Sequence, residues 1–144
     1  VHQTGEADLG RMREAYERAD AKCEAAPFLY DMAERYRWAH VAVARAGAIT
    51  VGELTAMALP ALLIPLPIAT HGHQEANARH LESHGAARVI LQRDLTGEAL
   101  AGYLMEMNGD RSRLEEMSRS AASLARENAT DEVATLCRET ARAA

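Results

Sequence analysis

The fold class is indicated by the stretch Arg45-Ala46-Gly47-Ala48-Ile49-Thr50-Val51-Gly52-Glu53. It follows the apolar run HVAVA at residues 40–44, which predicts a buried strand, and it leads into a predicted helix from Thr50 to about Ala58. Small residues between the two leave backbone N–H groups uncovered. At a helix start, such groups and the positive end of the helix dipole favour an anion, so this loop suits a phosphate.

The same alternation of short apolar runs with period-3.6 segments continues on both sides of this stretch. The other predicted strands are residues 1–4, 23–28, 61–65 and 87–91, and the other predicted helices are residues 8–21, 31–39 and 74–84, with further helices starting at Thr96, Asp110 and Thr130. Strands that alternate with helices predict an α/β protein. We therefore expect one domain over residues 1–144, with a Rossmann-like, doubly wound parallel sheet.

Composition excludes several classes of protein. Sixteen basic against twenty-one acidic side chains give a net charge of −5, which argues against nucleic acid as a partner. The longest apolar run, residues 56–68, is interrupted by three prolines and is shorter than the roughly 20 residues that span a bilayer. Cys23 and Cys137 lack CxxC spacing, which predicts two reduced thiols in a cytoplasmic protein.

Two interpretations of Thr50 and Glu53 stay open on local grounds. Thr50-x-x-Glu53 matches a capping box, in which the carboxylate folds back on the first turn of its own helix. Alternatively, Thr50 adds a hydroxyl to the phosphate loop, and the Glu53 carboxylate accepts two hydrogen bonds from a ribose diol. Gly47 is either part of that loop or only a turn glycine.

The loop at residues 66–73 is long enough to hold a ligand and ends in His73-Gln74-x-x-Asn77, at the start of a predicted helix. Amide side chains suit sugar hydroxyls, although Gln74 and Asn77 can equally be solvated helix-start residues. His71, His73, His80 and His84 raise the alternative of a metal-binding protein. The H-E-x-x-H pattern is absent, so no metal site is predicted, and no G-x-S-x-G elbow offers a nucleophile.

Together these loops resemble the carboxyl-terminal, donor-binding domain of the family 28 glycosyltransferases, which have the two-domain GT-B architecture. The resemblance covers nearly the whole chain. It is carried, in order and spacing, by His2-Gln3-Thr4-Gly5, Phe28-Leu29-Tyr30-Asp31-Met32-Ala33, Tyr36-x-Trp38-Ala39, Arg45 to Glu53, Leu59-Pro60-Ala61, Ile64-Pro65-x-Pro67 and His73-Gln74-x-x-Asn77-Ala78.

The resemblance implies an inverting, metal-independent and cofactor-free transfer of N-acetylglucosamine from UDP-GlcNAc to undecaprenyl-diphosphate-linked N-acetylmuramoyl-pentapeptide. The enzyme would act as a peripheral protein on the cytoplasmic side of the bacterial membrane. It also implies roles for residues. Leu29 would read the uracil through its backbone, Ala48, Ile49 and Thr50 would hold the diphosphate, and Glu53 would hold the ribose. His73, Gln74 and Asn77 would surround the sugar, and the remaining binding candidates are Val51, Gly52, Phe28, Arg45 and Gly47.

This sequence departs from the family pattern at Tyr30, Ala44, Ile68 and His71-Gly72. The family's domain also begins with another strand and a Gly-Gly-Ser loop, and an amino-terminal domain holds the acceptor site and the presumed base. Neither is found in residues 1–144, so we expect a truncated chain without its central strand and without a catalytic residue. The alternatives are a transferase with another lipid acceptor and a nucleotide-sugar-binding subunit that needs a membrane-anchored partner.

Overall fold

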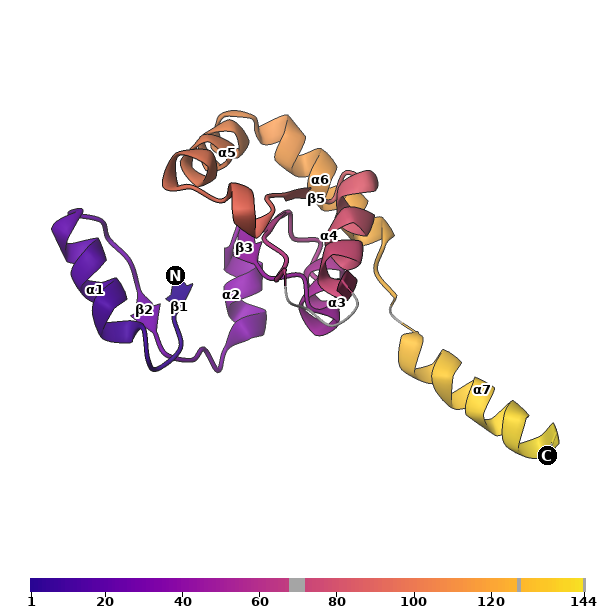
Figure 1. Ribbon diagram of the computed structural model, residues 1–144. Helices are drawn as coiled ribbons and strands as arrows, with labels where there is room; N and C mark the ends of the chain where they lie inside the picture. Colours follow the sequence, from indigo (N-terminus) through magenta and orange to yellow (C-terminus); the bar gives the residue numbers. More distant parts are fainter. Residues whose placement is uncertain (68–71, 127, 144) are drawn as a thin grey trace. The chain divides into compact units, whose positions relative to one another are not determined.

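The computed structural model describes residues 1–67, 72–126 and 128–143. Its contacts divide the chain into a first unit, residues 1–35, and a second unit, residues 36–144 (Figure 1). The second unit contains most of the buried residues. The extent of a single domain over residues 1–144 stays a prediction.

The first unit consists of β1 (His2–Gln3), α1 (Leu9–Arg18), β2 (Ala25–Ala26) and the beginning of α2 (Met32–Trp38). β1 and β2 pair in parallel, with His2 opposite Ala25. Gly5, with φ +75°, makes the turn that leaves β1, in a backbone region that side chains disfavour. α1 buries none of its residues, so this unit is held mainly by its short strand pair and by polar contacts.

The second unit is built on a parallel sheet in the order β3 (Ala42–Ala44), β4 (Ala61–Leu63), β5 (Ala87–Val89). Val43 lies opposite Leu62, and Leu62 lies opposite Arg88. α3 (Ala48–Ala56) connects β3 to β4, and α4 (His73–Ser83) lies between β4 and β5 in the sequence. Every residue of β4 is buried, as expected for the central strand of a sheet covered on both faces.

Helices cover both faces of this sheet, as in a doubly wound fold. On one face, Leu63 packs with Leu54 of α3 and Leu81 of α4. On the other face, Leu62 packs with Ile64 and Ile90. This cluster is covered by Leu95 and by Leu100 and Tyr103 of α5 (Gly97–Gly109). The alternation of β4 side chains between the two faces therefore produces two apolar layers.

The carboxyl-terminal helices begin where the sequence predicts. After η2 (Gln92–Asp94), the Thr96 hydroxyl caps α5 by accepting from the Ala99 N–H at 3.0 Å. The Asp110 carboxylate caps α6 (Arg111–Ser123) by accepting from the Arg113 N–H at 3.0 Å. The last helix, α7 (Ala129–Ala143), starts one residue before the predicted Thr130.

Two features differ from the sequence-based expectation. The strands form two sheets, of two and three strands, and no ladder among the described residues joins them. In addition, α3 starts at Ala48 and not at Thr50, because Gly47 takes the extended N-cap conformation (φ −64°, ψ 150°). Thr50 therefore lies inside the first turn, and the capping-box interpretation of Thr50 and Glu53 is wrong.

Candidate functional site

The amino end of α3 presents uncovered backbone donors. No side chain caps the helix, and its first helical bond runs from the Val51 N–H to the Gly47 carbonyl at 2.9 Å. The N–H groups of Ala48, Ile49 and Thr50 consequently lack partners within the helix. A Cβ built on Gly47 would lie 3.9 Å from the Thr50 hydroxyl, so this hydroxyl lies close to the N-cap of α3. The arrangement suits an anion.

The next two predicted binding residues, Val51 and Gly52, differ in surroundings. Val51 is half-buried, its side chain packs against the core, and its N–H donates to the Gly47 carbonyl. Gly52 is exposed, and a Cβ built on it would meet no atom within 4 Å. Val51 therefore supports the helix, whereas Gly52 lies on open helix surface.

Glu53 lies on the exposed surface of α3 and is held by Tyr36 of α2. The Tyr36 hydroxyl donates to Oε2 of Glu53 at 3.1 Å. Burial, and then the neighbouring Glu53 carboxylate, raise the pKa of Tyr36 to about 12. Among the described residues this is the only hydrogen bond of the Glu53 side chain, so Oε1 is available to a ligand. Sequence analysis assigned no role to Tyr36.

Gln74 and Asn77 are half-buried on α4 and bind the backbone of two neighbouring loops. The Asn77 amide donates to the Ala46 carbonyl at 3.0 Å, and the Gln74 side-chain carbonyl accepts from the Leu66 N–H at 3.0 Å. They are therefore not merely solvated helix-start residues. Among the described residues, no hydrogen bond uses the other half of either amide. His73 is exposed at the first position of α4.

Arg45 connects the carboxyl ends of the three strands of the second unit. Its guanidinium donates from Nη1 to the Ile64 carbonyl, which follows β4, at 2.9 Å. It also donates to Oε1 of Gln92, which follows β5, at 2.6 Å. Gln92 was not predicted, because its sequence neighbourhood contains no motif that points to Arg45.

In the first unit, Leu29 is buried and its N–H donates to the side-chain carbonyl of Gln3 at 3.0 Å. The Leu29 carbonyl oxygen is therefore the backbone atom of this residue that can contact a uracil. Phe28 and Tyr30 flank it with exposed rings whose centroids lie 4.9 Å apart, edge to face. Gln3 is a third residue whose role was not predicted, since its partner lies 26 residues away.

The histidines do not form a metal centre in the described parts of the chain. The rings of His80 and His84 lie 4.6 Å apart, and Nδ1 of His84 lies 2.8 Å from the His80 carbonyl. Within residues 1–67, 72–126 and 128–143, no group of three or more potential metal-ligating side chains comes together. His71 and Ile68, with the middle of the loop at residues 66–73, lie outside the described residues. Cys23 and Cys137 are free thiols.

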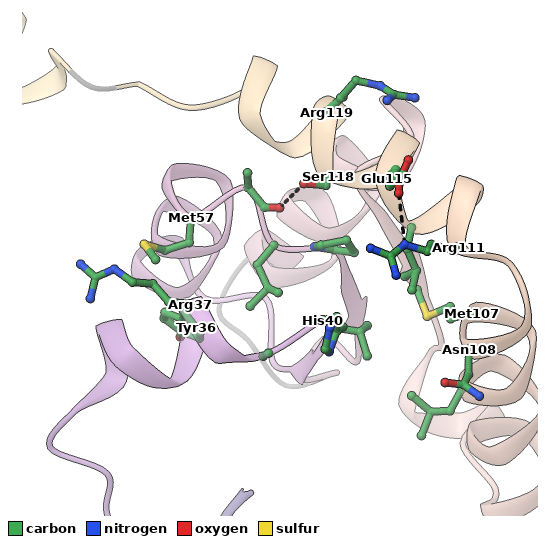
Figure 2. Close-up of a pocket in the computed structure, with 17 residues that line it drawn as sticks. Tyr36, Arg37, His40, Met57, Met107, Asn108, Arg111, Glu115, Ser118 and Arg119 are labelled. Carbon is green, nitrogen blue, oxygen red and sulfur yellow. Dashed lines mark hydrogen bonds and ion pairs between the residues drawn. The ribbon is translucent and has the colours of Figure 1, made fainter.

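A cavity of about 910 Å³ lies at the opposite end of the sheet (Figure 2). Its lining includes His40 and Val41, just before β3, and Pro60, just before β4. Figure 2 shows Tyr36 and Met57 on one side and the Arg111–Glu115 pair of α6 on the other. Ligands of parallel α/β sheets bind beyond the carboxyl ends of the strands, whereas this cavity lies at their amino ends. Tyr36 lines the cavity and also donates to Glu53.

No helix in the described parts of the chain has both the length and the apolar character that crossing a bilayer requires.

Comparisons with known proteins agree with the resemblance. The family model "Glycosyltransferase family 28 C-terminal domain" matches residues 1–133. UDP-N-acetylglucosamine–N-acetylmuramyl-(pentapeptide) pyrophosphoryl-undecaprenol N-acetylglucosamine transferases from Halorhodospira halophila and Marinobacter nauticus are 51% and 44% identical, over 98% and 97% of this chain. The chain spans only 40% and 39% of the length of these two relatives.

Solved structures show the same relationship. The crystal structure of Acinetobacter baumannii MurG matches 96% of this chain and 42% of its own, with a TM-score of 0.88 and 36% identity. The glycosyltransferase VinC, solved in complex with dTDP, matches 90% of this chain and 32% of its own, with a TM-score of 0.66, and at 20% identity it supports the fold alone. By its sequence and its α/β fold with parallel sheets, the chain belongs to glycosyltransferase family 28, whose carboxyl-terminal domain it contains.

Proposed function

We propose that residues 1–144 form the donor-binding part of an inverting transferase that moves N-acetylglucosamine from UDP-GlcNAc to undecaprenyl-diphosphate-linked N-acetylmuramoyl-pentapeptide. The names of the bacterial relatives support this substrate pair. The observation that carries the proposal is the uncapped start of α3, with the Glu53 carboxylate one turn further along the helix.

In this proposal the diphosphate of UDP lies against the N–H groups of Ala48, Ile49 and Thr50 and the Thr50 hydroxyl. The acceptor's 4-hydroxyl attacks the anomeric carbon, the bond to the UDP oxygen breaks, and the configuration inverts. Donors already in place at the helix start stabilise the negative charge that develops on the departing UDP, so no metal ion is required.

Further residues are assigned to the other parts of the donor. The Glu53 carboxylate accepts from the ribose diol, and the Leu29 carbonyl accepts from the uracil N3–H, next to the exposed Phe28 ring. On the sugar side, the Gln74 side-chain N–H groups and the Asn77 side-chain carbonyl, together with His73, bind hydroxyl and acetamido groups.

The acceptor and the catalytic base belong, in this proposal, to parts of the enzyme beyond residues 1–144, since the relatives are about two and a half times as long. Holding two substrates together contributes a large share of the rate of such a reaction. We further propose that the enzyme acts at the cytoplasmic face of the membrane as a peripheral protein, because its acceptor is anchored there by its lipid.

The test is a calorimetric titration of the full-length protein with UDP-GlcNAc. Glu53→Ala is expected to weaken donor binding by about 1.5–3 kcal/mol, the scale of a hydrogen bond to a charged group. Glu116→Ala, which removes an exposed carboxylate from α6, is the matched control and should bind the donor like the unmodified protein. Unchanged affinity in Glu53→Ala would reject the ribose assignment.

A transfer assay tests the reaction itself. Full-length protein should transfer N-acetylglucosamine from UDP-GlcNAc to the lipid-linked N-acetylmuramoyl-pentapeptide and should use UDP-galactose poorly. Equal transfer from both donors, or transfer only to a different lipid, would contradict the proposed substrate pair.

A further inference from the structure

The hydroxyl of Tyr36 reaches from α2 to the Glu53 carboxylate on α3, with 3.1 Å between the two oxygens. We propose that Tyr36 is a positioning residue for ribose recognition, whose hydroxyl fixes the Glu53 carboxylate in the orientation that receives the diol. This inference rests on the proposed function, in which Glu53 binds the ribose. Tyr36 itself need not touch the nucleotide.

Tyr36 is a rigid anchor. Its half-buried ring packs against the main core of the second unit, together with Ala39 and Met57. A tyrosine ring has only two side-chain torsions, and packing fixes both of them. The hydroxyl at the end of the ring therefore has a defined position relative to α3.

Glu53, in contrast, is a long and exposed side chain that would sample many rotamers on its own. Glutamate is among the side chains that lose most conformational entropy when they are ordered. A hydrogen bond to Tyr36 restricts the carboxylate before the nucleotide arrives, so less of this entropy is lost upon binding.

The chemistry of the anchor also suits a diol. Within the described residues, no Lys, Arg or His forms an ion pair with Glu53, so Tyr36 orients the carboxylate without neutralising it. Because the pKa of Tyr36 is raised to about 12, its hydroxyl stays protonated and remains a donor even in mildly alkaline solution. Oε2 thus accepts from Tyr36, while Oε1 has no partner among the described residues and is left to accept from the ribose hydroxyls.

The experiment compares UDP with 2′-deoxy-UDP in calorimetric titrations of the full-length protein. The unmodified protein should prefer UDP by roughly 10-fold or more, because a hydroxyl bound to a carboxylate is lost in the analogue. In Tyr36→Phe, UDP should bind roughly 3- to 10-fold more weakly while the analogue changes less, so that the preference falls at least about threefold. The matched control is Tyr103→Phe, whose hydroxyl makes no hydrogen bond among the described residues, and it should keep the preference.

Two further variants separate the inference from the proposed function. Glu53→Gln should reduce the preference for UDP, and an unchanged preference would reject Glu53 as the ribose ligand. If Glu53→Gln reduces the preference and Tyr36→Phe does not, the positioning role is wrong and the ribose assignment stands. A loss of thermal stability in Tyr36→Phe with an unchanged preference would likewise overturn it, since that is the signature of a purely structural hydroxyl. The double variant should lose no more preference than Glu53→Gln alone.

Discussion

The two units repeat the same order of strand and helix but are held together by different forces. In the second unit, the side chains of Leu54, Leu62 and Leu81 are at most 2% exposed and pack on both faces of a three-stranded sheet. In residues 1–35, all of which are described, Leu29 is the single buried apolar side chain. That unit relies instead on a two-residue ladder and on Arg35, which binds Glu24 and Asp31.

The proposed donor contacts therefore come from segments that differ in local stability. The diphosphate and ribose contacts come from α3, which is packed into a core. The uracil contact comes from a loop in the unit with little core. Because local stability follows buried apolar area, we expect the first unit to open at a lower free energy than the second.

The largest expected effect tests the core of the second unit. Leu62→Ala removes a fully buried side chain from the central strand and should lower the free energy of unfolding by about 2–5 kcal/mol. Leu9→Ala, at a half-buried position of α1 in the first unit, should cost less than about 1.5 kcal/mol. Urea denaturation of the two variants measures both values. Equal losses would contradict the expected difference in apolar packing between the two units.

The next largest loss of stability is expected when the hydrogen bond between α4 and the loop after β3 is removed. Asn77→Ala should cost about 1–3 kcal/mol, since it leaves the carbonyl of the buried Ala46 without its donor. The control is Asn108→Ala, at an exposed position of α5. Thermal denaturation should therefore separate the two variants. Similar melting temperatures would mean that water replaces the Asn77 amide at no cost.

An aspartate occupies the N-cap of α1 in the first unit and of α6 in the second, so the two helix caps can be compared directly. Asp110→Ala removes the carboxylate that caps α6 and should cost about 1 kcal/mol. Asp8 occupies the N-cap of α1 in the first unit but makes no capping hydrogen bond, so Asp8→Ala should cost clearly less. Chemical denaturation of both variants decides, and a reversed order would contradict the assigned caps.

The smallest effect is expected when the ion pairs of Arg35 in the first unit are removed. Arg35 contacts Glu24 at 2.6 Å and Asp31 at 2.9 Å, and its pKa is raised mainly by the hydrogen bond to Glu24. Arg35→Ala should speed amide hydrogen exchange in residues 24–35, and high salt should reduce this difference. Arg79→Ala, which removes comparable pairs from α4, should leave exchange in those residues unchanged.

Sequence predicted most of the local structure and fewer of the contacts. Thr96 and Asp110 were identified as helix starts because capping depends on residues three positions apart. The start of α3 was placed two residues late, because Thr50-x-x-Glu53 imitates a capping box. In the structure Glu53 turns instead to Tyr36, which lies 17 residues earlier in the sequence.

The hydrogen-bond partners of the candidate site residues could not be predicted from sequence patterns. The Gln3–Leu29, Asn77–Ala46 and Arg45–Gln92 bonds join residues that are 26, 31 and 47 positions apart. No periodicity encodes such separations, since they depend on how strands and helices pack. The roles of Leu29, Glu53 and the α4 residues in binding a donor stay predictions until ligand is titrated.

Arg45 connects the carboxyl ends of the three-stranded sheet through its hydrogen bonds to Ile64 and Gln92. One guanidinium ties together segments that follow three different strands, before any nucleotide is present. These three described segments are therefore held together before a nucleotide binds. Any closing motion during turnover should accordingly move this part as a single rigid piece.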